Sequence, residues 1–377
     1  MFLQLCENIY FTFLKGTFII LYFNLNGFHA VASLYIFVFF IFPFRMEVKH
    51  TLYKAGEFMI NRELVESSHF TIDKLGEGIF AAIAKGGGGA VSNAGIIDLG
   101  DKTLIFDTFN SHHAALDLAE TAEKLTNKPV SFVINSHWHG DHIRGNQCFR
   151  GAPIIASLAT RTKMIETHPE RISDQKAKIP QLLAHIEKLE KECKTEQDSA
   201  KAKKLRIQLD FLKEIESSLP KLEFTPPNIT FEQRMIFSGE SKTAILQTYG
   251  GGHTVCDAFL YLPDEKILFA GDLVQVQNHP LLSDGSPDVW LAILQKLRNL
   301  EVHHVVPGHG PVGTSSAIEN IRHYIASAFE LAVFSAEKGK DLQCVEIPGP
   351  FQDWEAGDLF YKNLEFLQRK NLHHGLR

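Results

Sequence analysis

Two stretches of the chain consist of short apolar runs separated by turns that are rich in glycine, aspartate and proline. Short runs with this punctuation are typical of β-strands. The first stretch predicts strands at residues 70–75, 78–85, 90–99, 102–107, 129–134 and 153–156. The second predicts strands at residues 229–237, 243–249, 257–262, 266–270 and 302–307.

Four other segments carry apolar residues at helical spacing instead. They predict helices at residues 113–125, 288–300, 315–337 and 353–370. Ser286 is a candidate N-cap of the second of these helices, and Pro287 suits its first turn. Strand groups in both halves of the chain, with helices between them, predict an α/β sandwich of two sheets.

Residues 157–222 differ from both patterns. Leu182, Ile186 and Leu189 recur at helical spacing, as do Leu205 and Leu209, and lysine and glutamate fill most positions between them. This predicts two helices in an antiparallel hairpin, with its turn near residues 196–200. The segment is then either a solvated structural insert, or a lid or oligomer contact.

The first 45 residues have an unusual composition. They hold 11 of the 29 Phe residues of the chain and only three charged residues. The longest uncharged apolar stretch, residues 28–44, is at the short limit for a bilayer span. We interpret residues 1–45 as a hydrophobic extension that is either not native or a membrane anchor, with a signal peptide as a third reading. The catalytic domain is expected within residues 46–377.

Composition and charge narrow the class of the remaining chain. The 377 residues are 45% hydrophobic and 22% charged, which excludes a disordered chain and a polytopic membrane protein. The net charge of −6 argues against broad binding to nucleic acid, so a small-molecule substrate is the expected partner. Five scattered cysteines indicate reduced thiols and a cytoplasmic protein, with membrane anchorage through the N-terminal segment as the alternative.

The strand predicted at residues 129–134 leads into a cluster of metal-binding residue types. His137, His139, Asp141 and His142 fall within six positions. Imidazole and carboxylate groups are ligands for a borderline divalent metal, above all zinc. In an extended strand end, His137 and His139 point to the same side and can hold one metal, whereas Asp141 and His142 can reach a second.

Three further candidate ligands follow apolar runs on glycine-rich loops. They are His253 after the strand at 243–249, Asp272 after the strand at 266–270, and His309 after the strand at 302–307. Each alone could be an ordinary loop residue. Seven metal-competent groups on such loops are better explained by one metal centre.

With these motifs, H-x-H-x-D-H followed by G-H, G-D and P-G-H-G, the sequence resembles the metallo-β-lactamase superfamily between about residues 70 and 313. The resemblance implies a four-layer αββα sandwich with the helical hairpin as an insert. It implies a first zinc site of His137, His139 and His253, and a second of Asp141, His142 and His309. Asp272 would bridge the two sites, and Asp107 would support them without binding metal.

The predicted activity follows from two zinc ions, although iron or manganese could replace them. The ions would lower the pKa of a bridging water to give hydroxide, and Asp141 would orient it and move a proton to the leaving group. We expect a glyoxalase II-like hydrolase acting on a small ester, thioester, lactone or amide. The alternatives are a phosphodiesterase, a β-lactamase, a mononuclear-iron persulfide dioxygenase and a non-catalytic binding protein.

The sequence differs from individual branches of the superfamily at positions that affect substrate binding. Gln275 stands where one class of β-lactamases carries Lys and where acyl-homoserine lactonases carry Tyr, and Cys256 is not at a ligand position. Residues 274–290 are expected to build part of the substrate pocket. Three residues there could contact substrate: His279, Asp284 and Trp290. Two weaker candidates for orienting the metal ligands lie elsewhere, at His112 and His113.

Overall fold

The computed structural model describes residues 9–14, 17–22 and 67–374. The chain divides into two compact units, residues 1–58 and 59–377. In the first unit, β1 (Ile9–Leu14) and β2 (Thr17–Tyr22) pair as an antiparallel hairpin. The apolar stretch at 28–44 and the boundary predicted after residue 45 lie outside the described residues. No helix in the described ranges is both long enough and apolar enough to cross a membrane.

The second unit contains a seven-stranded sheet that holds the strands predicted in the first half of the chain. Its order is β3-β4-β5-β6-β7-β8-β9. The strands are β3 (Phe70–Gly76), β4 (Ile79–Ala84), β5 (Ala94–Asp98), β6 (Thr103–Phe106), β7 (Val130–Ile134), β8 (Ile154–Ser157) and β9 (Ile229–Phe231). Neighbours are antiparallel up to β6 and parallel from β6 to β9. The change occurs where α1 (His112–Thr126) crosses from β6 to β7, because a parallel neighbour needs a long connection.

A five-stranded sheet holds the strands of the second half in the order β10-β11-β12-β13-β14. The strands are β10 (Arg234–Ser238), β11 (Thr243–Thr248), β12 (Ala258–Leu262), β13 (Ile267–Gln275) and β14 (His304–His309). Only the last pair is parallel, because α6 (Pro287–Leu297) lies between β13 and β14 in the chain. Pro287 opens α6 as expected, but the Ser286 side chain makes no capping hydrogen bond.

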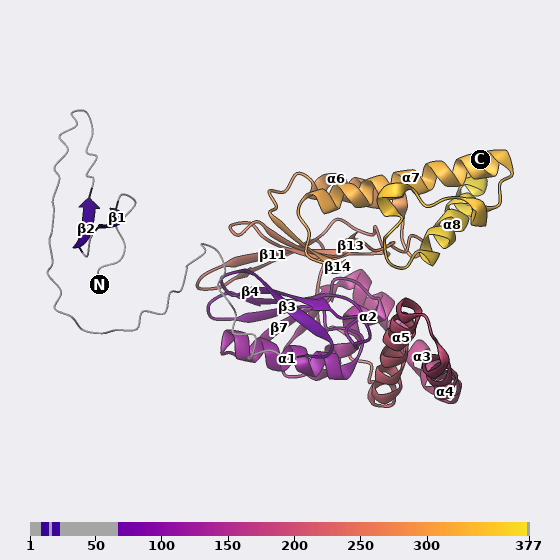
Figure 1. Cartoon of the computed structure of the whole chain (residues 1–377), viewed down its shortest axis with the longest axis horizontal. Coiled ribbons are helices and arrows are strands. Elements are labelled where there is room, and N and C mark those ends of the chain that lie inside the picture. The colour runs from indigo at the N-terminus through magenta and orange to yellow at the C-terminus, as the bar shows by residue number, and fades with distance from the viewer. Residues whose placement is uncertain (1–8, 15–16, 23–66, 375–377) are drawn as a thin grey trace. The chain divides into compact units, whose positions relative to one another are not determined.

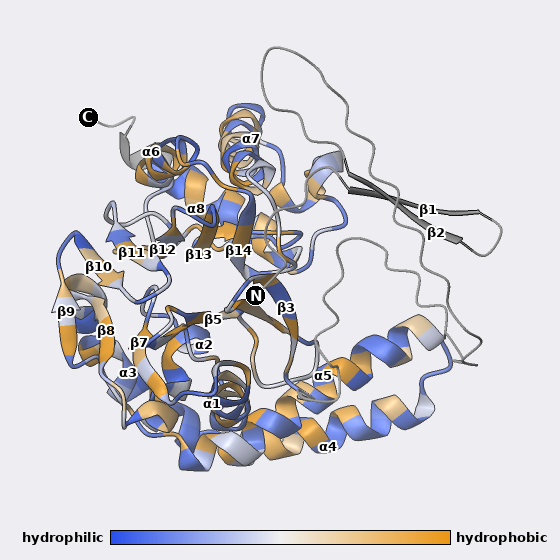
Figure 2. Ribbon diagram, turned by 90° about the vertical axis from the view of Figure 1, so that its left-hand side faces the viewer, coloured by the Kyte–Doolittle hydropathy of each residue, from blue (hydrophilic) through white to orange (hydrophobic). Residues whose placement is uncertain are grey.

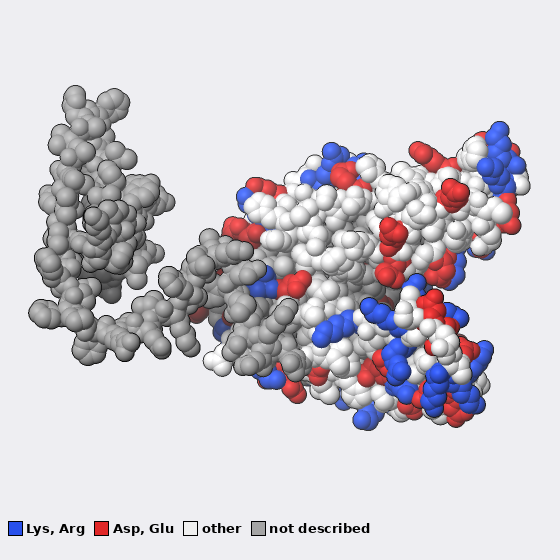
Figure 3. Space-filling model, viewed as in Figure 1, with Lys and Arg blue, Asp and Glu red and all other residues white. Residues whose placement is uncertain are grey.

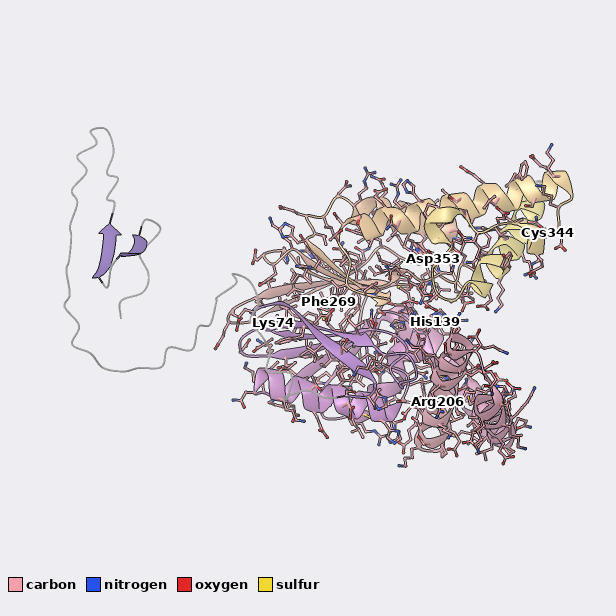
Figure 4. The ribbon with its side chains drawn as sticks, viewed as in Figure 1. Lys74, His139, Arg206, Phe269, Cys344 and Asp353 are labelled. Carbon is pink, nitrogen blue, oxygen red and sulfur yellow. The ribbon has the colours of Figure 1, made fainter. Side chains whose placement is uncertain are left out.

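The two sheets pack face to face and helices cover their outer faces, which confirms the predicted αββα sandwich (Figure 1). Phe106 and Phe269, one from each sheet, meet with ring centroids 6.0 Å apart. Figure 4 labels Phe269 between the two sheets. On one outer face, α1 buries Ala115, Leu118 and Ala122 against the seven-stranded sheet. On the other, α6, α7 (Ser316–Lys338) and α8 (Asp358–His374) pack on the five-stranded sheet.

The prediction of one strand at 229–237 is wrong. The chain turns at Glu232 and Gln233, which separate β9 from β10. β9 pairs with β8 in the seven-stranded sheet, whereas β10 pairs with β11 in the five-stranded sheet. The apolar run therefore passes from one sheet to the other, and the two exposed polar residues mark the crossing point.

The insert contains three helices rather than two. The predicted hairpin is present as α4 (Ile179–Thr195) and α5 (Ser199–Ser218), which lie side by side in Figure 2. The two helices bury Ile186, Leu189 and Leu209 between them. The helix that the sequence did not reveal is α3 (Leu158–Ala177). Its buried residues are Thr160, Met164, His168 and Ile172. Because two of these four residues are polar, the buried face lacks the run of apolar residues at helical spacing that predicts a helix.

Candidate metal centre

The predicted ligands come from four separated segments that meet at one edge of the sandwich. His137 and His139 follow β7, and His139 lies immediately before the short helix α2 (Gly140–Ile143). His253 follows β11, Asp272 lies within β13 and His309 ends β14. The labelled His139 lies at this edge, between the insert and the C-terminal helices (Figure 4). The sheet topology thus brings together residues that are up to 172 positions apart.

All seven predicted ligands converge, and they do so in two groups that match the predicted division. One group contains His137, His139, His253 and Asp272, and the other contains Asp141, His142 and His309. Within each group the potential ligand atoms lie within 4.8 Å of one another. Asp272 connects the groups, because its Oδ2 lies 3.1 Å from Nε2 of His253 while its Oδ1 lies 3.2 Å from Nε2 of His142.

Hydrogen bonds on the outer side of the imidazoles fix their orientation. Nδ1 of His253 donates to the backbone oxygen of Leu281 at 3.1 Å, and Nδ1 of His309 donates to that of Val91 at 3.2 Å. Nδ1 of His137 lies 2.9 Å from Oγ of Ser136. Because Nδ1 carries the proton in these rings, Nε2 offers a lone pair towards the centre.

His139 has the opposite orientation. Its Nε2 lies 3.0 Å from Oδ2 of Asp284, so that Nδ1 faces the centre. This Nδ1 lies only 3.1 Å from Nε2 of His253. Asp284, a candidate for substrate contact from the sequence, therefore acts on an imidazole of the cluster. Such a carboxylate fixes the tautomer and the ring orientation.

Asp107 is the buried support that the sequence predicts. It follows β6 in a left-handed conformation with φ of 63°, and its carboxylate is almost fully buried. The carboxylate accepts hydrogen bonds from N and Oγ of Ser136 and from Nδ1 of His142, each at 2.7 Å. It therefore holds His142 directly and His137 through Ser136.

The donor set fits cations. Nε2 of His137, Nε2 of His142 and Oδ1 of Asp272 are buried without a hydrogen-bond partner in the described part of the chain. With the outer nitrogens protonated, the inner atoms are lone pairs that face one another and face carboxylates. This arrangement is repulsive unless protons or metal ions lie between the atoms, and leaving such buried groups unsatisfied costs free energy.

The pKa directions describe the same electrostatic balance. Burial alone would lower the pKa of His142, but Asp272, Asp141 and Asp107 hold it well above its ordinary value. Burial alone would raise the pKa of Asp272, but His309 and His142 hold it well below its usual range. Protons on imidazoles thus balance the carboxylates, and divalent ions would displace those protons.

Several other candidates from the sequence have structural roles. His279 is buried with Nδ1 3.1 Å from the hydroxyl oxygen of Tyr324, and Trp290 is fully buried. The expectation that these two residues contact substrate is therefore wrong. His112 and His113 lie against α5, with Nδ1 atoms 3.2 Å from Oγ of Ser218 and 3.0 Å from Oε1 of Glu214, respectively.

Gln275 and Cys256 are both buried near the centre. Nε2 of Gln275 donates to Oδ2 of Asp272 at 3.1 Å, so this position serves the central carboxylate. Sγ of Cys256 lies 3.0 Å from Oγ of Ser157 and is not in either ligand group, as expected. The four cysteines of residues 67–370 are free thiols.

Sequence reasoning missed the residues that hold the loops. Asn93 donates to the backbone oxygens of Pro307 and Gly310, which flank His309. His168 of α3 places Nε2 2.6 Å from the backbone oxygen of Trp138, between two predicted ligands. No signal marks such residues in the sequence, because their partners are backbone groups that every residue carries.

With the fold and the cluster in view, comparison with known proteins gives the family. A model of the metallo-β-lactamase superfamily matches residues 87–309. This range includes all seven predicted ligands and covers more than half of the chain. The chain belongs to the metallo-β-lactamase superfamily.

Individual relatives are distant. The chain is 23% identical over 235 residues to "Beta-lactamase-like protein 2 homolog" of Caenorhabditis elegans. The aligned region is 62% of this chain and 60% of that protein. The chain is 22% identical over 242 residues to a linear primary-alkylsulfatase of Pseudomonas sp.. The aligned region is 60% of this chain and 43% of that relative. A metallo-β-lactamase type 2 of Bacteroides fragilis is 33% identical over 92 residues, 22% of this chain and 37% of the relative. The chain thus matches less than two thirds of the length of each.

Two solved structures are also similar to the chain at low identity. A metallo-β-lactamase from Pontibacter korlensis superposes with a TM-score of 0.49 at 20% identity, covering 68% of this chain and 99% of that one. The DIM-1 metallo-β-lactamase gives a TM-score of 0.49 at 20% identity, covering 70% of this chain and all of the other.

Proposed function

We propose that the protein is a zinc-dependent hydrolase that cleaves a small ester, thioester, lactone or amide. The observation that carries the proposal is the convergence of five imidazoles and two carboxylates in two adjoining groups. His137, His139 and His253 would hold one zinc ion, and Asp141, His142 and His309 the other. Asp272 is the candidate for contact with both ions, because its carboxylate lies against imidazoles of both groups.

Two zinc ions, when bound, supply a water of lowered pKa and polarise the oxygen of the scissile group. The protein would contribute orientation and proton transfer. Asp107, Asp284 and the backbone oxygen of Leu281 keep the imidazoles in one tautomer, so that no reorganisation is needed during the reaction.

Asp141 is the candidate for moving the proton. Its side chain is 23% exposed, whereas that of Asp272 is 4% exposed, so Asp141 faces the side from which substrate can approach. Burial would raise the pKa of Asp141, but His142 and His309 lower it strongly, so the carboxylate is ionised at neutral pH. It can accept a proton and pass it to the leaving group.

Turnover of acyl and phosphoryl substrates by the zinc-loaded protein tests the proposal. We expect the protein to hydrolyse ester, thioester or lactone substrates with higher kcat/KM than bis(4-nitrophenyl) phosphate. Asp141→Asn should lower kcat about 100-fold, as expected for loss of a general base. Faster turnover of the phosphodiester would favour the phosphodiesterase alternative instead.

A further inference from the structure

A guanidinium group lies against the metal-binding loop of the candidate centre. Arg144 follows α2 directly, and a Cβ added to Gly140 would lie 2.8 Å from its Nε atom. Gly140 separates the predicted ligands His139 and Asp141 in the sequence. The absence of a side chain at position 140 therefore lets this guanidinium rest on the loop that carries both ligands.

Neutral groups alone hold the Arg144 guanidinium. Nη1 donates to Oδ1 of Asn110 at 3.1 Å, and Nη2 donates to Oε1 of Gln175 at 2.6 Å. The Nε atom is buried and has no hydrogen-bond partner among residues 67–370. Within the same residues, Arg144 forms no ion pair with a carboxylate. Oδ2 of Asp141 instead faces His142 and His309.

A second guanidinium approaches the same loop from α3. Arg171 lies four residues before Gln175, so both project from the same face of the helix. Cζ of Arg171 lies 4.7 Å from the centroid of the Trp138 ring. Trp138 stands between His137 and His139 in the sequence, and Arg171 is exposed to solvent and forms no ion pair in the described part of the chain.

Two neighbouring guanidinium groups that form no ion pair would be unusual if they served only to stabilise the fold. The two guanidinium groups approach the same loop, since Gln175, one turn after Arg171 on α3, accepts a hydrogen bond from Arg144. Surface charges are generally mixed on the insert (Figure 3). The carboxylates of Asp141 and Asp284 act on Arg144 and Arg171, respectively, through space, but among the described residues neither guanidinium forms an ion pair. Because most buried charges in proteins are paired, two such cations are suited to an incoming anion.

We propose that Arg144 and Arg171 bind an anionic group of the substrate, a carboxylate, sulfate or phosphate, beside the metal centre. This inference rests on the proposed function and deepens it, because it restricts the substrates to small anionic esters or thioesters. The planar guanidinium is the side chain best matched to such groups. The proposal also gives α3 of the insert a role in binding substrate. Gln275 on β13 is neutral and cannot pair with an anion in this way.

A pair of matched esters tests the proposal on the zinc-loaded full chain. 4-Nitrophenyl glutarate carries a free carboxylate, and its methyl ester is the neutral counterpart. We expect the natural protein to prefer the anionic ester in kcat/KM by about tenfold or more. Arg171→Gln should lower this preference about tenfold, mainly through a higher KM for the anionic ester.

Three variants separate a binding role from a structural one. Arg144→Gln should also reduce the preference, and Arg144→Lys should restore part of it because the charge remains. Lys163→Gln is the matched control, since Lys163 is on the same helix, 5.8 Å from the same Trp138 ring, but lies 3.9 Å from Glu166. It should leave the preference unchanged. An Arg171→Gln variant that keeps the full preference, or that loses both esters equally, overturns the proposal.

Direct binding distinguishes a failure of this proposal from a failure of the proposed function. If the natural protein hydrolyses neither ester, the proposed hydrolase activity loses support. Calorimetric titration of the same zinc-loaded proteins with glutarate, sulfate and phosphate then tests the anion site and shows which anion it prefers. We expect binding that weakens at least tenfold in Arg171→Gln, and equal binding by both proteins contradicts the anion site.

Discussion

The side-chain oxygen of Asn363 accepts a hydrogen bond from the backbone N–H of Leu282 at 3.0 Å, across 81 positions of the sequence. The side-chain nitrogen of Asn363 donates to the backbone oxygen of Pro280 at 2.7 Å. Leu281, between these two residues, accepts the hydrogen bond from Nδ1 of His253. Asn363 in α8 therefore holds the segment that orients the predicted ligand His253. Through this segment the C-terminal helix stabilises the metal centre without contributing a ligand.

Replacement of Asn363 should weaken both the fold and the centre. Asn363→Leu removes hydrogen bonds to two buried backbone groups, so we expect a loss of about 2–3 kcal/mol in the free energy of unfolding. Zinc affinity should fall because the Leu281 backbone oxygen is no longer fixed. Urea denaturation and competition with a chromophoric chelator measure the two effects. Lys362→Ala, its exposed neighbour on α8, is the control and should change stability by less than about 0.5 kcal/mol.

Asp284 should govern metal affinity without being a ligand. Its Oδ2 lies 3.0 Å from Nε2 of His139, so Asp284→Asn weakens the hydrogen bond that fixes this ring. We expect zinc affinity to fall about 10-fold to 100-fold, measured by chelator competition. Asp288→Asn changes an exposed carboxylate that pairs with Lys370 and should have no such effect. Equal affinities of the Asp284 variant and the natural protein would show that the hydrogen bond does not orient His139 for binding.

A glycine beside the central carboxylate makes a steric test possible. A Cβ at Gly308 would collide with Oδ1 of Asp272. Gly308→Ala should therefore displace this carboxylate and lower bound zinc at least tenfold while the far-ultraviolet circular dichroism stays unchanged. Gly349→Ala meets no atom within 4 Å and serves as the control. Retention of the full metal content by Gly308→Ala would argue against Asp272 as a ligand.

His168 should make the fold sensitive to acid. Burial lowers its pKa to about 4, against 6.5 for an ordinary histidine. Between these values the unfolded chain binds more protons than the folded one, so stability is complete above pH 6.5 and falls as the pH decreases towards 4. The loss by pH 4 is on the order of 3 kcal/mol.

The pH dependence of stability in two variants checks this assignment. His168→Gln keeps a donor for the backbone oxygen of Trp138 but does not titrate, so its stability should fall less between pH 6.5 and pH 4 than that of the natural protein. His185→Gln changes an exposed residue of α4 and should follow the natural profile. Parallel profiles for all three proteins would show that His168 is not the source of the acid sensitivity.

The sequence predicted the centre well because its ligands follow strands. In two packed sheets, loops that leave at one edge meet there, so His137, His253 and His309 could be grouped without coordinates. The hydrogen-bond partners of the ligands were harder to predict. The backbone oxygens of Leu281 and Val91 leave no mark in the sequence, because every residue carries the same group.

The parts of the fold that were missed share a physical cause. Helix α3 buries Thr160 and His168 beside two apolar residues, so its inner face does not read as hydrophobic. The segment at 229–237 has apolar residues on both sides of Glu232 and Gln233, and these two polar residues carry the chain from one sheet to the other. Hydrophobic pattern reports burial, and it does not report which sheet or which polar partner a residue meets.

Metal content measured together with turnover tests the central claim most directly. We predict about two zinc ions per chain in the purified protein, hydrolysis that is lost on removal of the metal and restored by zinc, and lower metal content and activity in His139→Ala and Asp141→Ala. One iron ion per chain with uptake of oxygen would contradict the zinc hydrolase. So would full turnover of the same substrate by the metal-free protein or by both variants.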